Sequence, residues 1–103
     1  MSKHFSGSFY FEKTVNGNLI GEFSNNSDDT IMTESANKVN PDGKFEGTYI
    51  STWFDIDLTK ADLEIKPNGH KYILTWTGTG GQEYKGEGFL AGDRLIGYYK
   101  KSN

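Results

Sequence analysis

The chain has 103 residues, a net charge of −3 and no cysteine, and this length fits one domain, which we expect to span residues 1–103. The missing cysteines exclude a disulfide scaffold, a thiolate nucleophile and cysteine-based zinc sites. No basic patch of the kind that binds nucleic acid occurs. Residues 1–5 lack the apolar core of a signal peptide and no long apolar run follows, so we expect a soluble, cytoplasmic protein without membrane contact.

Turn-forming residues recur at regular intervals and divide the chain into eight segments. In chain order, the first break is Asn16-Gly17, which separates residues 9–14 from residues 19–23 and predicts a tight type I′ hairpin turn. The next breaks lie at residues 25–29, 40–43, 55–60, 67–69, 78–81 and 91–93. Short segments at this spacing are typical of sandwiches and barrels. We therefore predict an all-β fold, an antiparallel meander β-barrel of about eight strands.

Most segments alternate between apolar and polar residues, as half-buried strands do, and residues 72–77 show the pattern clearly. Residues 30–39 fit worst, because Glu34, Asn37 and Lys38 interrupt the alternation. We predict a weak strand over residues 30–36. The alternative for this stretch is a mobile loop at the barrel mouth.

A glycine followed two residues later by an aromatic residue recurs along the chain. The four examples are Gly7-Ser8-Phe9, Gly21-Glu22-Phe23, Gly47-Thr48-Tyr49 and Gly97-Tyr98-Tyr99. In each example both residues would share one face of a strand. Inward glycines permit the bends that a closed sheet needs, and a nearby ring can cover the gap that the missing side chain leaves. The plainer explanation is chance, since glycine is abundant in this chain.

Eight meander strands that begin with a Gly-x-aromatic element resemble the avidin and lipocalin barrels, whose first strand typically opens with Gly-x-Trp; here Phe9 stands in place of the Trp. Residues 72–76 resemble the Trp-bearing strands of avidin-like barrels. Residues 72–99, with Tyr-x-Leu-x-Trp, Tyr-x-Gly-x-Gly and Leu-Ile-Gly-Tyr, are similar to the tail of small uncharacterised bacterial proteins. The resemblance implies a closed barrel and suggests ligand binding. No set of biotin-binding residues maps onto the sequence, and the helix of lipocalins has no counterpart.

Residues that could carry catalysis or bind a metal are few and scattered. Neither His4 nor His70 has a neighbour at metal-ligand spacing, so we interpret both as solvated residues. Asp55 and Asp57 would share one strand face and could bind calcium or act in acid–base chemistry, but we favour ordinary surface charge. No nucleophile elbow or phosphate loop is present. We therefore predict no catalytic residue, no metal site and no cofactor, and an enzyme stays open as the least favoured of three functions.

The aromatic residues are the most informative set, because the predicted register turns seven rings and one hydroxyl toward the barrel interior. The candidate ligand-binding residues are Phe9, Tyr49, Ser51, Trp53, Tyr72, Trp76, Tyr84 and Tyr99. An eight-stranded barrel has an interior that side chains just fill or that holds one small ligand. The rings are therefore either the packed core or the wall of a pocket, and both interpretations stay open.

For function, we predict a non-catalytic protein that binds a small, partly apolar or aromatic ligand in the barrel mouth. The alternative is an interaction or inhibitor protein with a solid core that acts through its surface and loops. The outward apolar residues Ile50, Phe54 and Ile73 motivate this alternative and would also allow a homo-oligomer.

Overall fold

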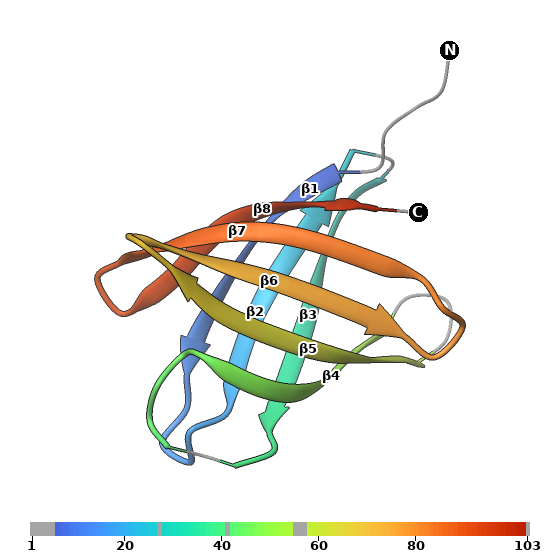
Figure 1. Cartoon of the computed structure of the whole chain (residues 1–103). Helices are drawn as coiled ribbons and strands as arrows, with labels where there is room; N and C mark the ends of the chain where they lie inside the picture. The colour runs from blue at the N-terminus through green and yellow to red at the C-terminus, as the bar shows by residue number, and fades with distance from the viewer. Residues whose placement is uncertain (1–5, 27, 41, 55–57, 103) are drawn as a thin grey trace.

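The computed structural model describes residues 6–26, 28–40, 42–54 and 58–102. The strands in these ranges are β1 (Ser6–Lys13), β2 (Leu19–Asn25), β3 (Asp28–Lys38), β4 (Gly47–Phe54), β5 (Leu58–Asn68), β6 (Lys71–Gly78), β7 (Glu83–Ala91) and β8 (Arg94–Lys101). Each pairs antiparallel with the next, and β1 pairs with β8, so the sheet closes into a barrel (Figure 1). The predicted eight-stranded all-β meander barrel is confirmed. Within the described ranges, no helix is long and apolar enough to span a membrane.

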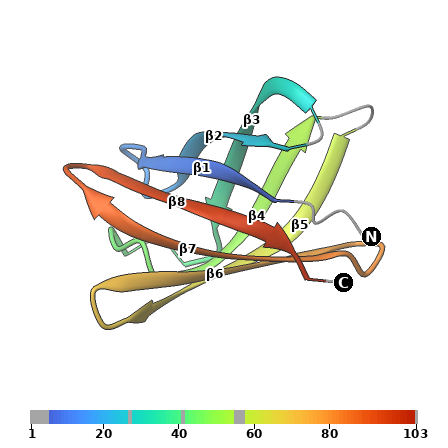
Figure 2. The ribbon, with the colours of Figure 1, turned by 90° about the horizontal axis from the view of Figure 1, so that it is seen from above.

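The two ends of the barrel are built differently. In Figure 1, strands β5 to β8 cross over β1 to β3, and Figure 2 shows β8 lying beside β1 where the sheet closes. One end carries the β1–β2, β3–β4, β5–β6 and β7–β8 connections, and we call it the closed end. The other carries the β2–β3 turn and the β6–β7 loop, and we call it the open end.

The first hairpin differs from the prediction. A two-residue type I′ turn needs positive φ at both central residues, but Gly17, with φ of 83°, is the only residue of this connection in that region. The paired strands end at Lys13 and Leu19, and the Thr14 amide donates to the Asn18 carbonyl at 2.8 Å. The prediction of a type I′ turn was therefore wrong: the connection is a longer loop that needs one left-handed residue.

The stretch predicted as a weak strand or a loop is a full strand, so the loop alternative was wrong. β3 pairs with both β2 and β4. Glu34, Ala36 and Lys38 point inward and are buried, whereas Thr33 and Ser35 are exposed. The two-residue alternation is intact. Charged residues occupy two of its inward positions, and this hid the strand from a pattern based on hydrophobicity.

Two inward glycines, Gly7 and Gly97, lie where neighbouring backbones approach each other closely. Gly97 is opposite Phe9, and Gly7 is opposite Tyr99. An added β-carbon at Gly97 would lie 1.9 Å from the Glu87 carbonyl oxygen, far inside van der Waals contact. The strands therefore bend at positions that exclude a side chain, as expected for a curved sheet. The ring that covers each of these glycines comes from the neighbouring strand.

The closed end is filled by side chains. The hydroxyl of buried Tyr49 donates to the Phe45 carbonyl at 2.6 Å. The Lys38 ammonium forms an ion pair with Asp42 and donates to the Lys44 carbonyl at 2.6 Å. It also lies 5.4 Å from the centre of the Tyr49 ring. A buried charge needs such partners to offset its lost hydration, so these contacts let Lys38 close the barrel.

The close approach at Gly97 leads to a stability prediction. Gly97→Ala should destabilise the fold by at least about 2 kcal/mol, because the methyl group must displace the backbone of β7. Gly92→Ala is the control, since Gly92 has φ of 64° but open space around it, and should cost only about 1 kcal/mol for its left-handed conformation. Urea unfolding of both variants gives the comparison. Equal losses of stability would contradict the close approach.

Candidate functional site

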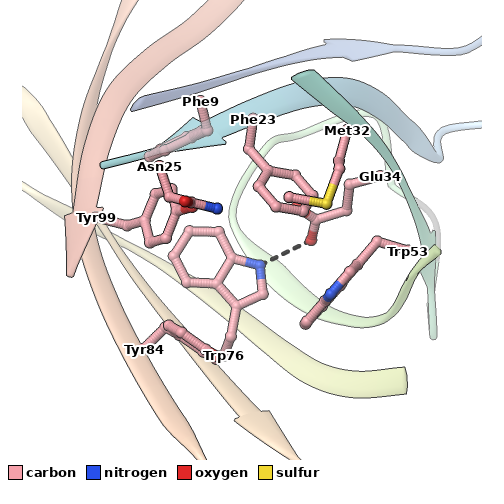
Figure 3. Close-up of a pocket in the computed structure, with 9 residues that line it drawn as sticks. All are labelled: Phe9, Phe23, Asn25, Met32, Glu34, Trp53, Trp76, Tyr84 and Tyr99. Atoms are coloured by element: carbon pink, nitrogen blue, oxygen red, sulfur yellow. Dashed lines mark hydrogen bonds between the residues drawn. The ribbon is translucent and has the colours of Figure 1, made fainter. Parts of the chain in front are cut away.

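A cavity of about 70 Å³ enters the barrel from the open end (Figure 3). It is lined by Phe9, Phe23, Asn25, Met32, Glu34, Trp53, Trp76, Tyr84 and Tyr99. A cavity needs a volume of roughly 10–15 Å³ to hold a single water. The space therefore admits several waters or the compact end of a small ligand.

Aromatic rings form most of the cavity wall and brace one another. Trp76 lies between Phe9 and Tyr99, at 5.5 and 6.0 Å between ring centres. Phe23 contacts Trp53 at 5.9 Å and Tyr99 at 6.2 Å, both edge to face. Rings at these separations attract one another beyond simple burial, so the wall is held in place without a ligand.

Glu34 supplies a carboxyl group to this aromatic cavity. Its side chain comes from β3, and the residue is only 4% exposed. The Trp76 indole N–H, on β6, donates to Oε2 at 2.8 Å, and the Ser51 hydroxyl, on β4, donates to the same oxygen. Figure 3 draws Glu34 pointing toward the surrounding rings and marks its bond to Trp76. Three strands thus position one carboxyl group.

The environment of Glu34 disfavours its charged form. Burial raises the pKa of this carboxyl from its usual 4.5 to about 7, although the hydrogen bonds from Ser51 and Trp76 act in the opposite direction. Among the described residues, no basic side chain forms an ion pair with it. Lys38, four residues further along β3 and so about 13 Å away, is paired with Asp42 at the closed end. Glu34 is therefore an ionisable group without a cationic partner among the described residues.

The structure divides the predicted site residues between the two ends. Those that line the cavity are Phe9, Trp53, Trp76, Tyr84 and Tyr99. Ser51 is fully buried and reaches the cavity only through its bond to Glu34. Tyr49 and Tyr72 lie toward the closed end, where Tyr72 packs 6.3 Å from Phe45. Both interpretations of the rings therefore apply, each to a different part of the barrel.

Four cavity residues were not among the predicted ones: Phe23, Asn25, Met32 and Glu34. Phe23 could have been found, because it shares the Gly-x-aromatic pattern of the first strand. Met32 and Glu34 share one strand face with Ala36 and Lys38, two residues apart, and that alternation was the available signal. Nothing in the sequence pattern distinguishes Asn25 from other turn residues.

The described part of the chain shows no second site built from the remaining candidates. His70 lies in the exposed β5–β6 turn, whereas His4, Asp55 and Asp57 fall outside the described residues. Among the described residues, no group of His, Asp or Glu could hold a metal ion. A larger depression at the closed end is lined mostly by exposed residues of the β3–β4 loop and the β7–β8 hairpin. It contains no buried carboxyl, so the cavity at the open end is the candidate site.

The outward apolar residues stand among polar ones. Ile50 is 44% exposed on β4, and its paired neighbours are Asn37 and Asp62. Ile73 is half-buried on β6 and pairs with Glu87 on one side. The side chain of Phe54 lies outside the described part of the chain. Association through these residues remains a prediction.

Comparison of the chain with models of protein families, with curated protein sequences and with solved structures finds no significant match. The closed eight-stranded antiparallel meander is itself the architecture expected from the avidin and lipocalin resemblance.

The raised pKa of Glu34 predicts how stability depends on pH. An acid that titrates higher when folded than when unfolded destabilises the fold as it ionises, so stability should fall as pH rises from about 4.5 to about 7. The full shift corresponds to a loss of about 3 kcal/mol. Urea unfolding of the wild type and of Glu34→Gln, at several pH values, measures it.

Glu34→Gln keeps an acceptor for Ser51 and Trp76 but cannot ionise, so its stability should depend less on pH in this window. Asp42 and Glu87 do not interfere, because hydrogen bonds from Lys38 and Tyr98, respectively, lower the pKa of each and place their titration below the window. Parallel pH profiles for the wild type and the variant would contradict a buried, high-pKa Glu34.

The indole N–H of Trp76 should hold Glu34 as well as fill space. Trp76→Phe keeps a ring but removes the donor, which should cost about 1.5–3 kcal/mol near pH 8, the usual value for a hydrogen bond to a charged group. At pH 5, where the carboxyl is protonated, the cost should be smaller. A cost that does not change with pH would show that only the volume of the indole matters.

Proposed function

We propose that this chain is a non-catalytic binding protein that takes a small, partly apolar ligand into the open end of its barrel. The observation that carries the proposal is a cavity walled by braced aromatic rings around one hydrogen-bonded polar group. Small-molecule sites commonly combine a mostly apolar wall with a few well-placed polar groups that orient the ligand.

The architecture supports the same proposal. The avidin and lipocalin barrels that the sequence resembles also suggest ligand binding, although a fold alone does not fix a function. The closed end, filled by Phe45, Tyr49 and Lys38, would serve as a rigid floor. The open end would provide the entrance.

The arrangement around Glu34 supports binding over catalysis. The Ser51 hydroxyl donates a hydrogen bond to the carboxyl, but Ser51 is fully buried and does not line the cavity. A nucleophile must reach the substrate, and this one lies behind the group that would activate it. The carboxyl is better placed to accept a hydrogen bond from a ligand or to form an ion pair with a cationic one.

Native mass spectrometry of the purified protein tests for a co-purified molecule, and NMR titration with phenol and benzyl alcohol tests the cavity directly. The probes should shift the indole N–H resonances of Trp53 and Trp76, which line it. Trp53→Ala should weaken probe binding at least tenfold, because Trp53 is a large ring of the wall.

Tyr98→Ala is the matched control, since Tyr98 is an aromatic residue that is 59% exposed on the outer face of β8. Its removal should leave binding unchanged. If no molecule co-purifies, and neither these two neutral probes nor the small organic cation choline shifts the two indole resonances, the proposed function is wrong. The surface-acting alternative then takes its place.

A further inference from the structure

The cavity combines an aromatic wall with a buried carboxyl group, and a neutral ligand does not require both. Its wall consists mainly of aromatic rings, and the one carboxyl group among its described lining residues, on Glu34, is buried. Both described donors to this carboxyl reach Oε2, and no described donor reaches Oε1. The described residues that line the cavity include no Lys, Arg or His. The site therefore offers negative charge and π surface, and the described lining supplies no cation to match them.

We propose that the cavity binds a small organic cation, a quaternary or other alkylated ammonium group, with the Glu34 carboxylate as its counter-ion and the aromatic rings as its cage. This inference rests on the proposed binding function and specifies its ligand class. Ring faces carry negative potential and attract ammonium groups, most strongly where water is excluded. An anionic ligand would be repelled by Glu34, and a purely apolar one would leave the buried carboxylate unpaired.

The same barrel holds a cation in a comparable way at its closed end. There the Lys38 ammonium lies between the Asp42 carboxylate and the Tyr49 ring, 5.4 Å from the ring centre. The chain thus supplies an anion, a ring and a cation at the closed end. At the open end it supplies the anion, Glu34, and several rings. Among the described residues the second set has no cation, and a ligand can provide it.

Binding of a cation should be coupled to ionisation of Glu34. The carboxyl, with a pKa of about 7, is largely protonated at pH 6, so a cation that requires the carboxylate displaces its proton to the buffer.

Among the described residues, the other titratable groups facing this part of the interior are the hydroxyls of Tyr84 and Tyr99 at the cavity, with Tyr49 and the Asp42-paired Lys38 further down the barrel. Burial raises the pKa of Tyr99 and raises that of Tyr49 to about 12, so both stay neutral in the range of the experiment.

Calorimetric titration with choline, and with its neutral isostere 3,3-dimethyl-1-butanol, tests the proposal between pH 5.5 and 8.5. A ligand that binds only the ionised form should bind up to about 30-fold more tightly at the upper pH, because the ionised fraction rises from roughly 0.03 to 0.97. Choline should also release close to one proton at pH 6, measured with buffers of different ionisation enthalpy. The neutral isostere should bind more weakly than choline at pH 8.5 and release no proton.

Glu34→Gln keeps the shape of the site and its acceptor but removes the charge. In this variant choline should bind no better than the neutral isostere, without pH dependence, while circular dichroism confirms the fold. If the isostere binds the wild type as tightly as choline at every pH, the cation inference is overturned while the binding function stands. If phenol and benzyl alcohol bind but choline does not, the inference is likewise overturned. Failure of all these probes would remove both.

Discussion

Closing the sheet between β1 and β8 leaves no free edge and gives all eight strands one shared interior. Every second residue of each strand must fit into that space. A large side chain on one strand therefore requires a small residue opposite it on the next strand. Phe9 opposite Gly97 and Tyr99 opposite Gly7 are two such pairs. The exchange of rings for glycines lets the sheet curve without leaving the interior empty, and it also decides where space remains.

The interior is filled at one end and open at the other, and a charged residue of β3 marks each region. Lys38 is satisfied by groups of the β3–β4 loop and belongs to the floor. Glu34 receives hydrogen bonds from β4 and β6, which tie three strands together around one carboxyl. Such a group stabilises the fold less than an apolar side chain of similar size would, since its charged form is costly to bury. A ligand that pairs with the carboxylate would offset this cost.

The sequence predicted the architecture well because turns and alternation are local properties. The breaks near residues 16–17, 67–69 and 91–93 all became connections between paired strands. The first hairpin was misassigned because Asn16-Gly17 specifies a turn but not the length of the loop around it. β3 was underestimated for a different reason: Glu34 and Lys38 are inward, and a hydrophobic pattern counts inward charges as errors.

The site was only partly predictable for a related reason. Phase along a strand shows that Trp53, Trp76 and Tyr99 face inward, and this was correct. Phase does not show the height of a residue within the barrel, so Tyr49 was grouped with them although it belongs to the floor. The partners of Glu34 lie 17 and 42 residues away in the chain, and only the closed sheet brings them together.

The most direct test of this account is an NMR titration of the Glu34 side-chain carboxyl carbon in the wild-type protein, with Glu34→Gln used to assign the signal. A carboxyl buried among rings, with no cationic partner among the described residues, should titrate with a midpoint near pH 7. A midpoint near 4.5, the ordinary value for glutamate, would mean that Glu34 is well solvated and that the open end of the barrel is not the enclosed site described here.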